Sequence, residues 1–347
     1  MRFDLIACLL GMLHRTYNLS LIGFGNVGRT FVSLLDRKRE YLAKEHNLGF
    51  QFTGIATRKL GWLVNPNGFD PTRLADGNFE GAVPADSLRH WMVAARPDAV
   101  FETTSLNPHT GQPAIDHLRS ALEHGAHAIS ANKGPVVYGY EELSALATKM
   151  HRRFYFESSV MDGAPIFNLF RDCLPAIELR GFRGILNSTT NVILEAMEQG
   201  QSFDDAVRYT QDIGVAESDP SNDIDGWDAA VKVAALATVL MRQPVRPDQV
   251  ERQGIRHLTA QQIEAARVEG RRYKVVCSAK VVANCIVAKV ALEALPISDP
   301  LAQVSGTSSV ISFETDMFPA LAIHEINPGL DAVAYGLLTD FLRAVKE

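Results

Sequence analysis

Alternating strand and helix patterns, a glycine-rich turn after the first strand and a change of pattern near residue 155 predict an α/β protein. The first part is typical of a doubly wound parallel sheet, and the second of an α+β domain with a mixed sheet. At roughly 150 residues per domain, the 347 residues suggest two domains. Hydrophobic residues make up 46% of the chain and charged residues 21%, which predicts a sizeable core and argues against disorder.

The net charge, the cysteine spacing and the length of the apolar runs argue against several classes of protein. The formal net charge of −6 argues against a basic surface for nucleic acid or an anionic membrane. The four cysteines lack Cys-x-x-Cys spacing, so a zinc site and a disulfide framework are disfavoured and a reducing, cytoplasmic location is favoured. The apolar run at residues 5–13 is shorter than the ~18 residues of a membrane helix. We interpret residues 1–16 as a docked N-terminal extension, or as sequence upstream of a start at Met12.

The first half of the chain has the element order of a parallel sheet. Residues 17–22 predict a short strand, the apolar stripe at residues 31–35 predicts a helix, and residues 50–56 predict a second strand. Glycine, proline and asparagine are frequent in residues 61–84, which predicts a long loop or insertion. The expected elements then alternate as helices 86–95, 114–124 and 141–151 and strands 99–102 and 126–130. Parallel strands joined in this way need helices on both faces of the sheet.

The second half mixes strands with two long helices. The expected strands are residues 154–157, 179–186, 274–279 and 286–290, and the expected helices lie near 189–200 and 226–242. This is the pattern of a mixed sheet with helices on one face. Residues 331–345 predict a last helix that returns to the first domain. We therefore expect a first domain at 1–152, a second at 153–317 and a C-terminal segment at 318–347.

A G-x-G-x-x-G turn lies between the first strand and the first helix. In this position the glycines permit a tight turn and let a pyrophosphate approach the helix N-terminus. The pattern predicts a Rossmann-like dinucleotide site, and a glycine turn without a ligand is the alternative. The residues expected at the cofactor are Gly23, Gly25, Asn26, Val27 and Gly28.

The end of the second strand bears on the choice of cofactor. An NAD site usually carries Asp or Glu there, for the ribose 2′-hydroxyl. This chain has Thr57, Arg58 and Lys59 instead. Two cations without an acid suit a 2′-phosphate, so NADP is favoured over NAD. An ordinary solvated turn would have the same composition.

Four motifs, in order along the chain, resemble those of the homoserine dehydrogenase family. They are residues 102–114 with 130–135, residues 157–166, residues 184–191, and residues 217–228 followed by Lys232. The resemblance runs from about residue 17 to the C-terminus. It implies an NAD(P)-dependent oxidoreductase that interconverts aspartate 4-semialdehyde and L-homoserine, in the biosynthesis of threonine and methionine.

Asp228 and Lys232 are the residues that we expect to carry the chemistry. They are four positions apart on one predicted helix, so they share a face. Such pairs are usually exposed ion pairs, but residues 229–231 and 233–234 are apolar, which predicts a buried lysine. A partly desolvated lysine can donate to the alkoxide that forms as hydride arrives, and take the proton back in reverse. The resemblance implies a second catalytic or substrate-positioning lysine, Lys133, at the carboxyl edge of the parallel sheet.

A cluster of carboxylates precedes that helix and would suit an ammonium group. The resemblance implies that Glu217 binds the amino group of the substrate, and Asp223 lies in the same cluster. The alternative is an Asx-rich turn in which Asp225 caps the helix. Asn187 and Thr189 are expected to contact the substrate, to cap a helix, or to do both.

The resemblance implies further ligands and a partner. Thr103, Thr104, Lys133 and Gly329 are expected at the cofactor. Relatives hold a monovalent cation, which we expect to be Na⁺, on backbone oxygens, and they usually form homodimers through the second domain. The matching positions here are Glu157, Val160, Asp162 and Ala164.

Two departures from the family pattern leave other functions open. Ser188 stands where the family has glycine, and the family's Gly-x-Gly-Ala-Gly loop is residues 325–329 here, which keep only Gly329. The alternatives are a dehydrogenase of another small oxo or hydroxy acid and a nucleotide-binding homologue with little turnover. The chain ends soon after the motifs, so we expect no fused kinase, no amino-acid-sensing domain and no feedback inhibition by threonine.

Overall fold

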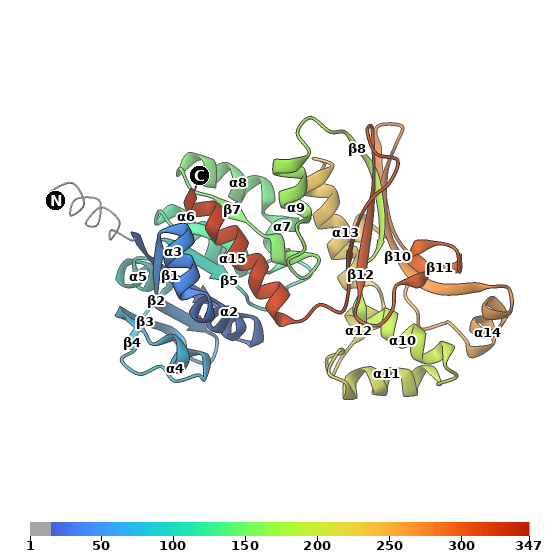
Figure 1. Ribbon diagram of the computed structural model, residues 1–347, viewed down its shortest axis with the longest axis horizontal. Helices are drawn as coiled ribbons and strands as arrows, with labels where there is room; N and C mark the ends of the chain where they lie inside the picture. Colours follow the sequence, from blue (N-terminus) through green and yellow to red (C-terminus); the bar gives the residue numbers. More distant parts are fainter. Residues whose placement is uncertain (1–14, 347) are drawn as a thin grey trace, which may run out of the picture.

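The computed structural model describes residues 15–346 and contains two β-sheets (Figure 1). Sheet A has the strand order β4-β3-β2-β1-β5-β6-β7, and sheet B the order β13-β12-β8-β10-β11-β9. The predicted pairing of a parallel-rich α/β sheet with a mixed α+β sheet is confirmed. Most of the expected extension lies outside the described residues, but Arg15 and Thr16 already belong to the first strand. Within residues 15–346, no helix is long and apolar enough to span a membrane.

Sheet A has a parallel centre. Its first strand, β1 (Arg15–Ile22), lies between β2 (Leu48–Thr57) and β5 (Ala99–Glu102), and both pairings are parallel. Strands β6 (His127–Ser130) and β7 (Phe154–Tyr155) continue the parallel order. Because the chain runs from β1 outward to β2 and then crosses to β5, the strand order reverses between β1 and β5. Ligands bind at such a switch point, at the carboxyl ends of the strands.

Helices cover both faces of sheet A. On one face, α2 (Asn26–Arg37) packs with the C-terminal helix α15 (Leu330–Lys346), and their apolar side chains join one core with β1. Figure 1 shows α15, in red, lying beside α2 and β1. On the other face, Trp91 is fully buried in a second core. The other helices of this part are α3 (Arg39–His46), α5 (Leu88–Ala95), α6 (Ala114–Glu123), α7 (Lys133–Tyr138) and α8 (Tyr140–Lys149).

The stretch 61–84 is not the predicted long loop. It forms β3 (Gly61–Phe69), α4 (Pro71–Ala75) and β4 (Val83–Ala85), and the two strands extend sheet A by antiparallel pairing. Residues 65–68, whose composition indicates a turn, bulge out between the paired positions Val64 and Phe69. An outer strand tolerates proline and glycine at such a bulge, because ladder hydrogen bonds are already interrupted there.

Sheet B is antiparallel except for one short pair at its edge. Its strands are β8 (Leu179–Ile185), β9 (Glu251–Arg252), β10 (Arg271–Val282), β11 (Cys285–Pro296), β12 (Ser309–Thr315) and β13 (Leu321–Glu325). Only β9 and β11 pair in parallel. The apolar helix α13 (Trp227–Leu240) packs on this sheet, and residues 229–231 and 233–237 are buried. The other helices of this part are α9 (Ile166–Asn168), α10 (Ser188–Glu198), α11 (Phe203–Asp212), α12 (Ser221–Ile224) and α14 (Ala260–Val268).

The chain passes between the two sheets twice. It leaves sheet A after β7 and returns from β13 into α15. The first passage makes a buried contact with the C-terminal helix, where the backbone N–H of Glu157 donates to Asp340 Oδ2 at 2.7 Å. The Glu157 carboxylate accepts from the N–H groups of Phe167 and Asn168, each at 2.8 Å. This contact fixes the start of α9 to the C-terminal helix.

Candidate active site

The glycine turn connects β1 to α2 at the switch point of sheet A. Gly23 has a φ of 94°, and a Cβ there would lie 2.6 Å from the carbonyl carbon of Thr103, so only glycine fits. A Cβ at Gly25 would meet nothing within 4 Å, which leaves open space beside the helix. No side chain caps the N-terminus of α2. A tight corner next to an uncapped helix N-terminus is what a pyrophosphate group requires.

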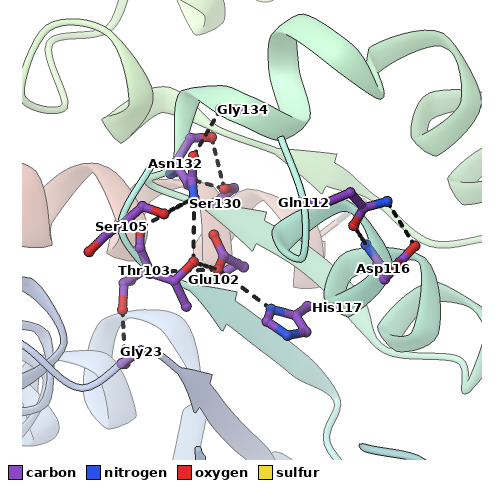
Figure 2. A network of polar contacts seen from close by, with 11 residues as sticks. Gly23, Glu102, Thr103, Ser105, Gln112, Asp116, His117, Ser130, Asn132 and Gly134 are labelled. Carbon is purple, nitrogen blue, oxygen red and sulfur yellow. Dashed lines mark hydrogen bonds and ion pairs between the residues drawn. The ribbon is translucent and has the colours of Figure 1, made fainter. Parts of the chain in front are cut away.

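A buried polar network joins the glycine turn to the start of α7 (Figure 2). Thr103 donates from Oγ1 to the carbonyl oxygen of Gly23 at 2.9 Å. The side chain of Asn132 donates to the carbonyl oxygen of Thr104 at 3.2 Å, and its Oδ1 accepts from the N–H of Gly134 at 2.9 Å. Asn132 thereby caps α7, whose first residue is Lys133. The network fixes Thr103, Thr104 and Lys133 around one edge of the sheet.

Glu102 lies at the centre of this network, and sequence analysis did not single it out. Its side chain is fully buried, and Oε1 accepts from the backbone and hydroxyl groups of Thr104. His117 lies 3.7 Å from the same oxygen. The sequence does contain a sign of this role, because an acidic residue ends an otherwise apolar strand at the edge where ligands bind.

Two lysines share the carboxylate of Asp228. Lys133 Nζ lies 3.3 Å from Oδ1, and Lys232 Nζ lies 3.4 Å from Oδ2. Lys232 also donates to the carbonyl oxygen of Leu186 at 2.5 Å. All three charged side chains are less than 20% exposed. The helical spacing predicts the contact of Asp228 with Lys232. Lys133 reaches the same carboxylate from α7, a helix that belongs to the part of the chain around sheet A.

Burial and charge act in opposite directions on these groups. Burial alone disfavours the Asp228 carboxylate, but Lys133 and Lys232 overcome this effect and hold the pKa of Asp228 far below its usual value. Burial also opposes the Lys232 ammonium, yet the neighbouring carboxylates, Asp228 first, raise the pKa of Lys232. The cluster is therefore charged at neutral pH. Two ammonium groups at one carboxylate can stabilise negative charge on a reacting oxygen and supply a proton to it.

Asn187 caps a helix, as one of its two expected roles requires, and it also contacts two carboxylates of the site. Its Oδ1 accepts from the N–H of Thr190 at 2.9 Å and caps α10. Its Nδ2 donates to Asp223 at 2.6 Å and to Asp228 at 3.1 Å. Burial and the Asp228 charge raise the pKa of Asp223, while hydrogen bonds from Asn187 and Thr189 act against this rise. Asn187, Thr189 and Asp223 thus surround the Asp228 carboxylate.

Two acidic residues, Glu217 and Asp225, do not join the Asp228 cluster in this structure. Glu217 is exposed in the loop between α11 and α12, and its side chain has no hydrogen bond or ion pair among residues 15–346. Asp225 does not cap α13, because the N-cap is Gly226 at a φ of 78°. Asp225 pairs instead with Arg256, at 2.6 Å. The interpretation of Asp225 as a helix cap is therefore wrong.

The remaining expected cofactor residues lie at the same end of sheet A or beside α2. Arg58 and Lys59 occupy the exposed turn after β2, next to Thr57, and neither has an ion-pair partner in the part of the chain that the structure describes. Gly329 precedes α15 and borders a surface hollow of about 470 Å³ against α2. Ser188 needs none of glycine's freedom, because its φ is not positive and its hydroxyl donates to Thr307 at 3.0 Å.

The loop expected to hold a cation reverses direction at two positive φ angles. Asp162 has a φ of 41° and Gly163 of 90°. The backbone oxygens of Val160 and Asp162 accept no backbone hydrogen bond within residues 15–346. Unpaired carbonyl oxygens suit a hard cation, so these positions fit one. The backbone oxygen of Ala164, another of the expected ligands, already accepts from the N–H of Ile166 at 2.7 Å.

The sequence matches two family profiles that together cover most of the chain. "Homoserine dehydrogenase, NAD binding domain" matches residues 23–157, and "Homoserine dehydrogenase" matches residues 165–342. An NAD(+)-dependent homoserine dehydrogenase from Pseudomonas canavaninivorans is 33% identical over 94% of this chain and 95% of the relative.

Solved structures agree with this match. The homoserine dehydrogenase of Thiobacillus denitrificans superposes with a TM-score of 0.83 at 25% identity, over 96% of this chain and 74% of the other. A mutant hyperthermophilic archaeal homoserine dehydrogenase in complex with NADPH has a TM-score of 0.80 at 25% identity, over 96% and 98%. The chain therefore belongs to the homoserine dehydrogenase family, which comprises NAD(P)-dependent oxidoreductases that act on a CH–OH group.

Proposed function

We propose that the protein interconverts aspartate 4-semialdehyde and L-homoserine, as a step toward threonine and methionine. The observation that carries this proposal is the Lys133–Asp228–Lys232 cluster, which joins the carboxyl edge of sheet A to the core helix of sheet B. NAD(P), when bound at the glycine turn, supplies or accepts the hydride. The chain's own residues then manage the proton, the charge on the oxygen and the orientation of the substrate.

Each side chain of the cluster has a distinct role in this proposal. Lys232 donates a proton to the aldehyde oxygen during reduction and takes the alcohol proton during oxidation. Lys133 stabilises the negative charge that develops on that oxygen. Asp228 holds both ammonium groups in place through its two oxygens. Asn187 and Thr189 contact the substrate beside them.

The amino group of the substrate needs an anionic partner. Asp223 is partly buried and shares the side chain of Asn187 with Asp228, whereas Glu217 lies on the exposed loop before α12. We assign the ammonium group to Glu217, with Asp223 as a second contact. In this assignment the loop that carries Glu217 moves toward Asp223 when the substrate binds.

The dinucleotide is assigned to the switch point. Its pyrophosphate lies against the glycine turn and the N-terminus of α2, and its nicotinamide half lies near Thr103, Thr104 and Lys133, with Gly329 covering it. Arg58 and Lys59 favour NADP, because an exposed pair of cations without an acid suits the 2′-phosphate. NAD is the alternative, since the Pseudomonas relative is named NAD(+)-dependent while the archaeal relative was solved with NADPH.

Three further features belong to the proposal. A monovalent cation, Na⁺ in the first instance, binds the backbone oxygens at Glu157, Val160, Asp162 and Ala164. Two chains associate as a homodimer through the part that contains sheet B. The protein works in the cytoplasm, in keeping with the free thiols of Cys173, Cys277 and Cys285. Activity compared in Na⁺, K⁺ and tetramethylammonium buffers, and the mass of the particle in solution, test the first two.

The direct test is the absorbance assay with aspartate 4-semialdehyde and either NADPH or NADH. Lys232→Ala should reduce turnover by roughly 10²-fold or more, because proton transfer contributes that much. Lys280→Ala, at an exposed position of β10, is the matched control and should retain full activity. A wild-type protein that binds NADPH but leaves the aldehyde unreacted would refute the proposal. A panel of small oxo acids would then identify the substrate.

A further inference from the structure

Glu325 is aligned with Lys232 by the strand register of sheet B. It is the last residue of β13 and lies opposite Ser309 of β12. In turn β12 pairs with β8, so that Val310 lies opposite Ile185, and the next step of the same register brings Ser309 beside Leu186. Leu186, Ser309 and Glu325 therefore form one row across the end of the sheet. Lys232 donates to the carbonyl oxygen of Leu186, so it lies at one end of this row and Glu325 at the other.

The side chain of Glu325 lies on the face of the sheet that carries α13. Side chains alternate along a strand, so residues two apart share a face. Ile323 packs against the core that includes α13, whereas His324 is exposed. By this alternation Glu325 has the orientation of Ile323. The acid and Lys232 therefore lie on the same side of sheet B.

Glu325 has a buried oxygen without a partner. No hydrogen bond reaches its Oε2 from any residue between 15 and 346. Burial, followed by the charge of Asp162, raises the pKa of Glu325 to about 7, while Lys232 acts in the opposite direction. Asp162 belongs to the 157–164 loop and Lys232 to α13, and both act on the carboxylate through their charge, with no hydrogen bond or ion pair to Glu325 within residues 15–346. A buried carboxylate oxygen without a partner is costly in free energy, which points to a functional reason for it.

The gap between Glu325 and Lys232 suits a bridging molecule. Neighbouring strands lie about 4.8 Å apart, so two steps place the backbones of Leu186 and Glu325 roughly 10 Å apart. Lys232 lies at the Leu186 end of the row and Glu325 at the other end, with Ser309 between them. No hydrogen bond or ion pair joins Glu325 to Lys232 within residues 15–346, so a proton that moves between them has to pass through a bridging molecule.

Oxidation of an alcohol needs a proton acceptor in addition to a hydride acceptor. The alcohol loses a hydride from carbon and a proton from oxygen, while the C=O double bond forms. Lys232 has a raised pKa and stays protonated, so it can give a proton but cannot accept one unless it first loses one. Asp228 cannot serve as acceptor, because its two ion pairs keep its pKa far below the usual value. Another base must take the proton.

We propose that Glu325 is the proton acceptor behind Lys232. In the oxidising direction the hydride leaves for NAD(P)⁺, the hydroxyl proton passes to Lys232, and Lys232 passes one of its protons through water to the Glu325 carboxylate. In the reducing direction each transfer runs backward. Glu325 acts through Lys232 and does not contact the reacting atoms. The inference rests on the proposed function and gives a role to an acid that stands where the family loop has glycine.

The first test is the pH profile of kcat/KM for homoserine oxidation, compared between wild type and Glu325→Gln. The wild-type profile should bend near pH 7, where Glu325 titrates. The variant should lose this bend and be slower by about 10²-fold at pH 8, and Glu325→Asp should restore the bend. Glu314→Gln, at an exposed position of β12, should behave as wild type. A Glu325→Gln profile that keeps the bend, at a rate within about threefold of wild type, would overturn the proposal.

A second test does not depend on turnover. In protein with ¹³C-labelled glutamate side chains, the resonance that disappears in Glu325→Gln should titrate near pH 7. Lys232→Met should move that midpoint upward, because a positive charge that favours the carboxylate has been removed. A midpoint that ignores Lys232 would overturn the inference even in an active enzyme. A coupled titration in a protein that does not oxidise homoserine would support the Lys232–Glu325 pair and refute only the proposed substrate.

Discussion

Replacing Asp228 with Asn removes one charge from a group of three and nearly preserves shape. At 3.3 and 3.4 Å, each ammonium–carboxylate attraction amounts to about 5 kcal/mol with an effective dielectric constant near 20. The desolvation of the three groups offsets much of this attraction in the wild type. In the variant the attraction disappears while the desolvation of Lys133 and Lys232 remains. We therefore expect the free energy of unfolding to fall by roughly 3–5 kcal/mol.

Urea unfolding, followed by fluorescence at pH 7, measures this loss. The matched control is Asp225→Asn, three residues earlier, which breaks the exposed pair with Arg256 and should cost only about 0.2–1 kcal/mol. Because the pKa of Asp228 is lowered in the fold, its stabilisation is present above the unfolded pKa and disappears as pH falls through the folded one. The difference between wild type and Asp228→Asn should thus be constant above about pH 5 and shrink in strong acid. Equal losses from the two substitutions at pH 7 would show that Asp228 is not the centre of a buried ion-pair cluster.

Other perturbations give equally definite outcomes. Gly23→Ala should lower both the free energy of unfolding in urea and the affinity for the dinucleotide, because its Cβ would clash with Thr103. Gly25→Ala, whose Cβ meets open space, should leave the free energy of unfolding unchanged and weaken only dinucleotide binding, measured by fluorescence titration. Equal losses of stability in the two variants would contradict the geometry. Burial raises the pKa of Asp340 to about 7, so wild type loses stability as pH rises from about 4 to 7. Asp340→Asn should therefore cost about 3 kcal/mol more at pH 5 than at pH 9, and equal costs at the two pH values in urea unfolding would contradict this reasoning. Arg58→Ala should raise the Kd of NADPH by about tenfold and leave that of NADH unchanged, because one charge-assisted contact is lost, and a parallel change in both would remove the argument for NADP.

Local patterns in the sequence predict most of sheet A and part of the site. The strand ending at Glu102 and the helix carrying Asp228 and Lys232 follow from apolar runs and helical spacing, both of which are short-range properties. The strand β3 does not, because the turn-forming residues 65–68 lie inside it and only its pairing with β2 makes the bulge acceptable. Composition describes what a segment prefers in isolation, whereas β3 takes its order from its neighbours in the sheet, β2 and β4.

Contacts between the two sheets lie beyond the reach of local patterns. Lys133 joins Asp228 from a helix of sheet A, and no periodicity connects these two positions. The sequence shows Glu325 only as a departure from the glycine of the family loop. Its position opposite Ser309 follows from the register of β13 with β12. Register depends on the whole sheet, because each strand sets the alignment of the next.

The double passage of the chain between the sheets limits how the cleft can open. Because two segments connect the parts that carry sheets A and B, one after β7 and one after β13, we expect a hinge motion about these segments and not a sliding motion. The segment after β7 also contacts α15: the N–H of Glu157 donates to Asp340, and Gly163 approaches Gly336, where a Cβ would lie 3.0 Å away. Lys133 lies on α7, whereas Asp228 and Lys232 both lie on α13, so a motion that drew α7 away from α13 would separate Lys133 from Asp228 and leave the Asp228–Lys232 pair intact. The Asp228 carboxylate would then both position the proton donor Lys232 and hold the two parts of the site together through Lys133.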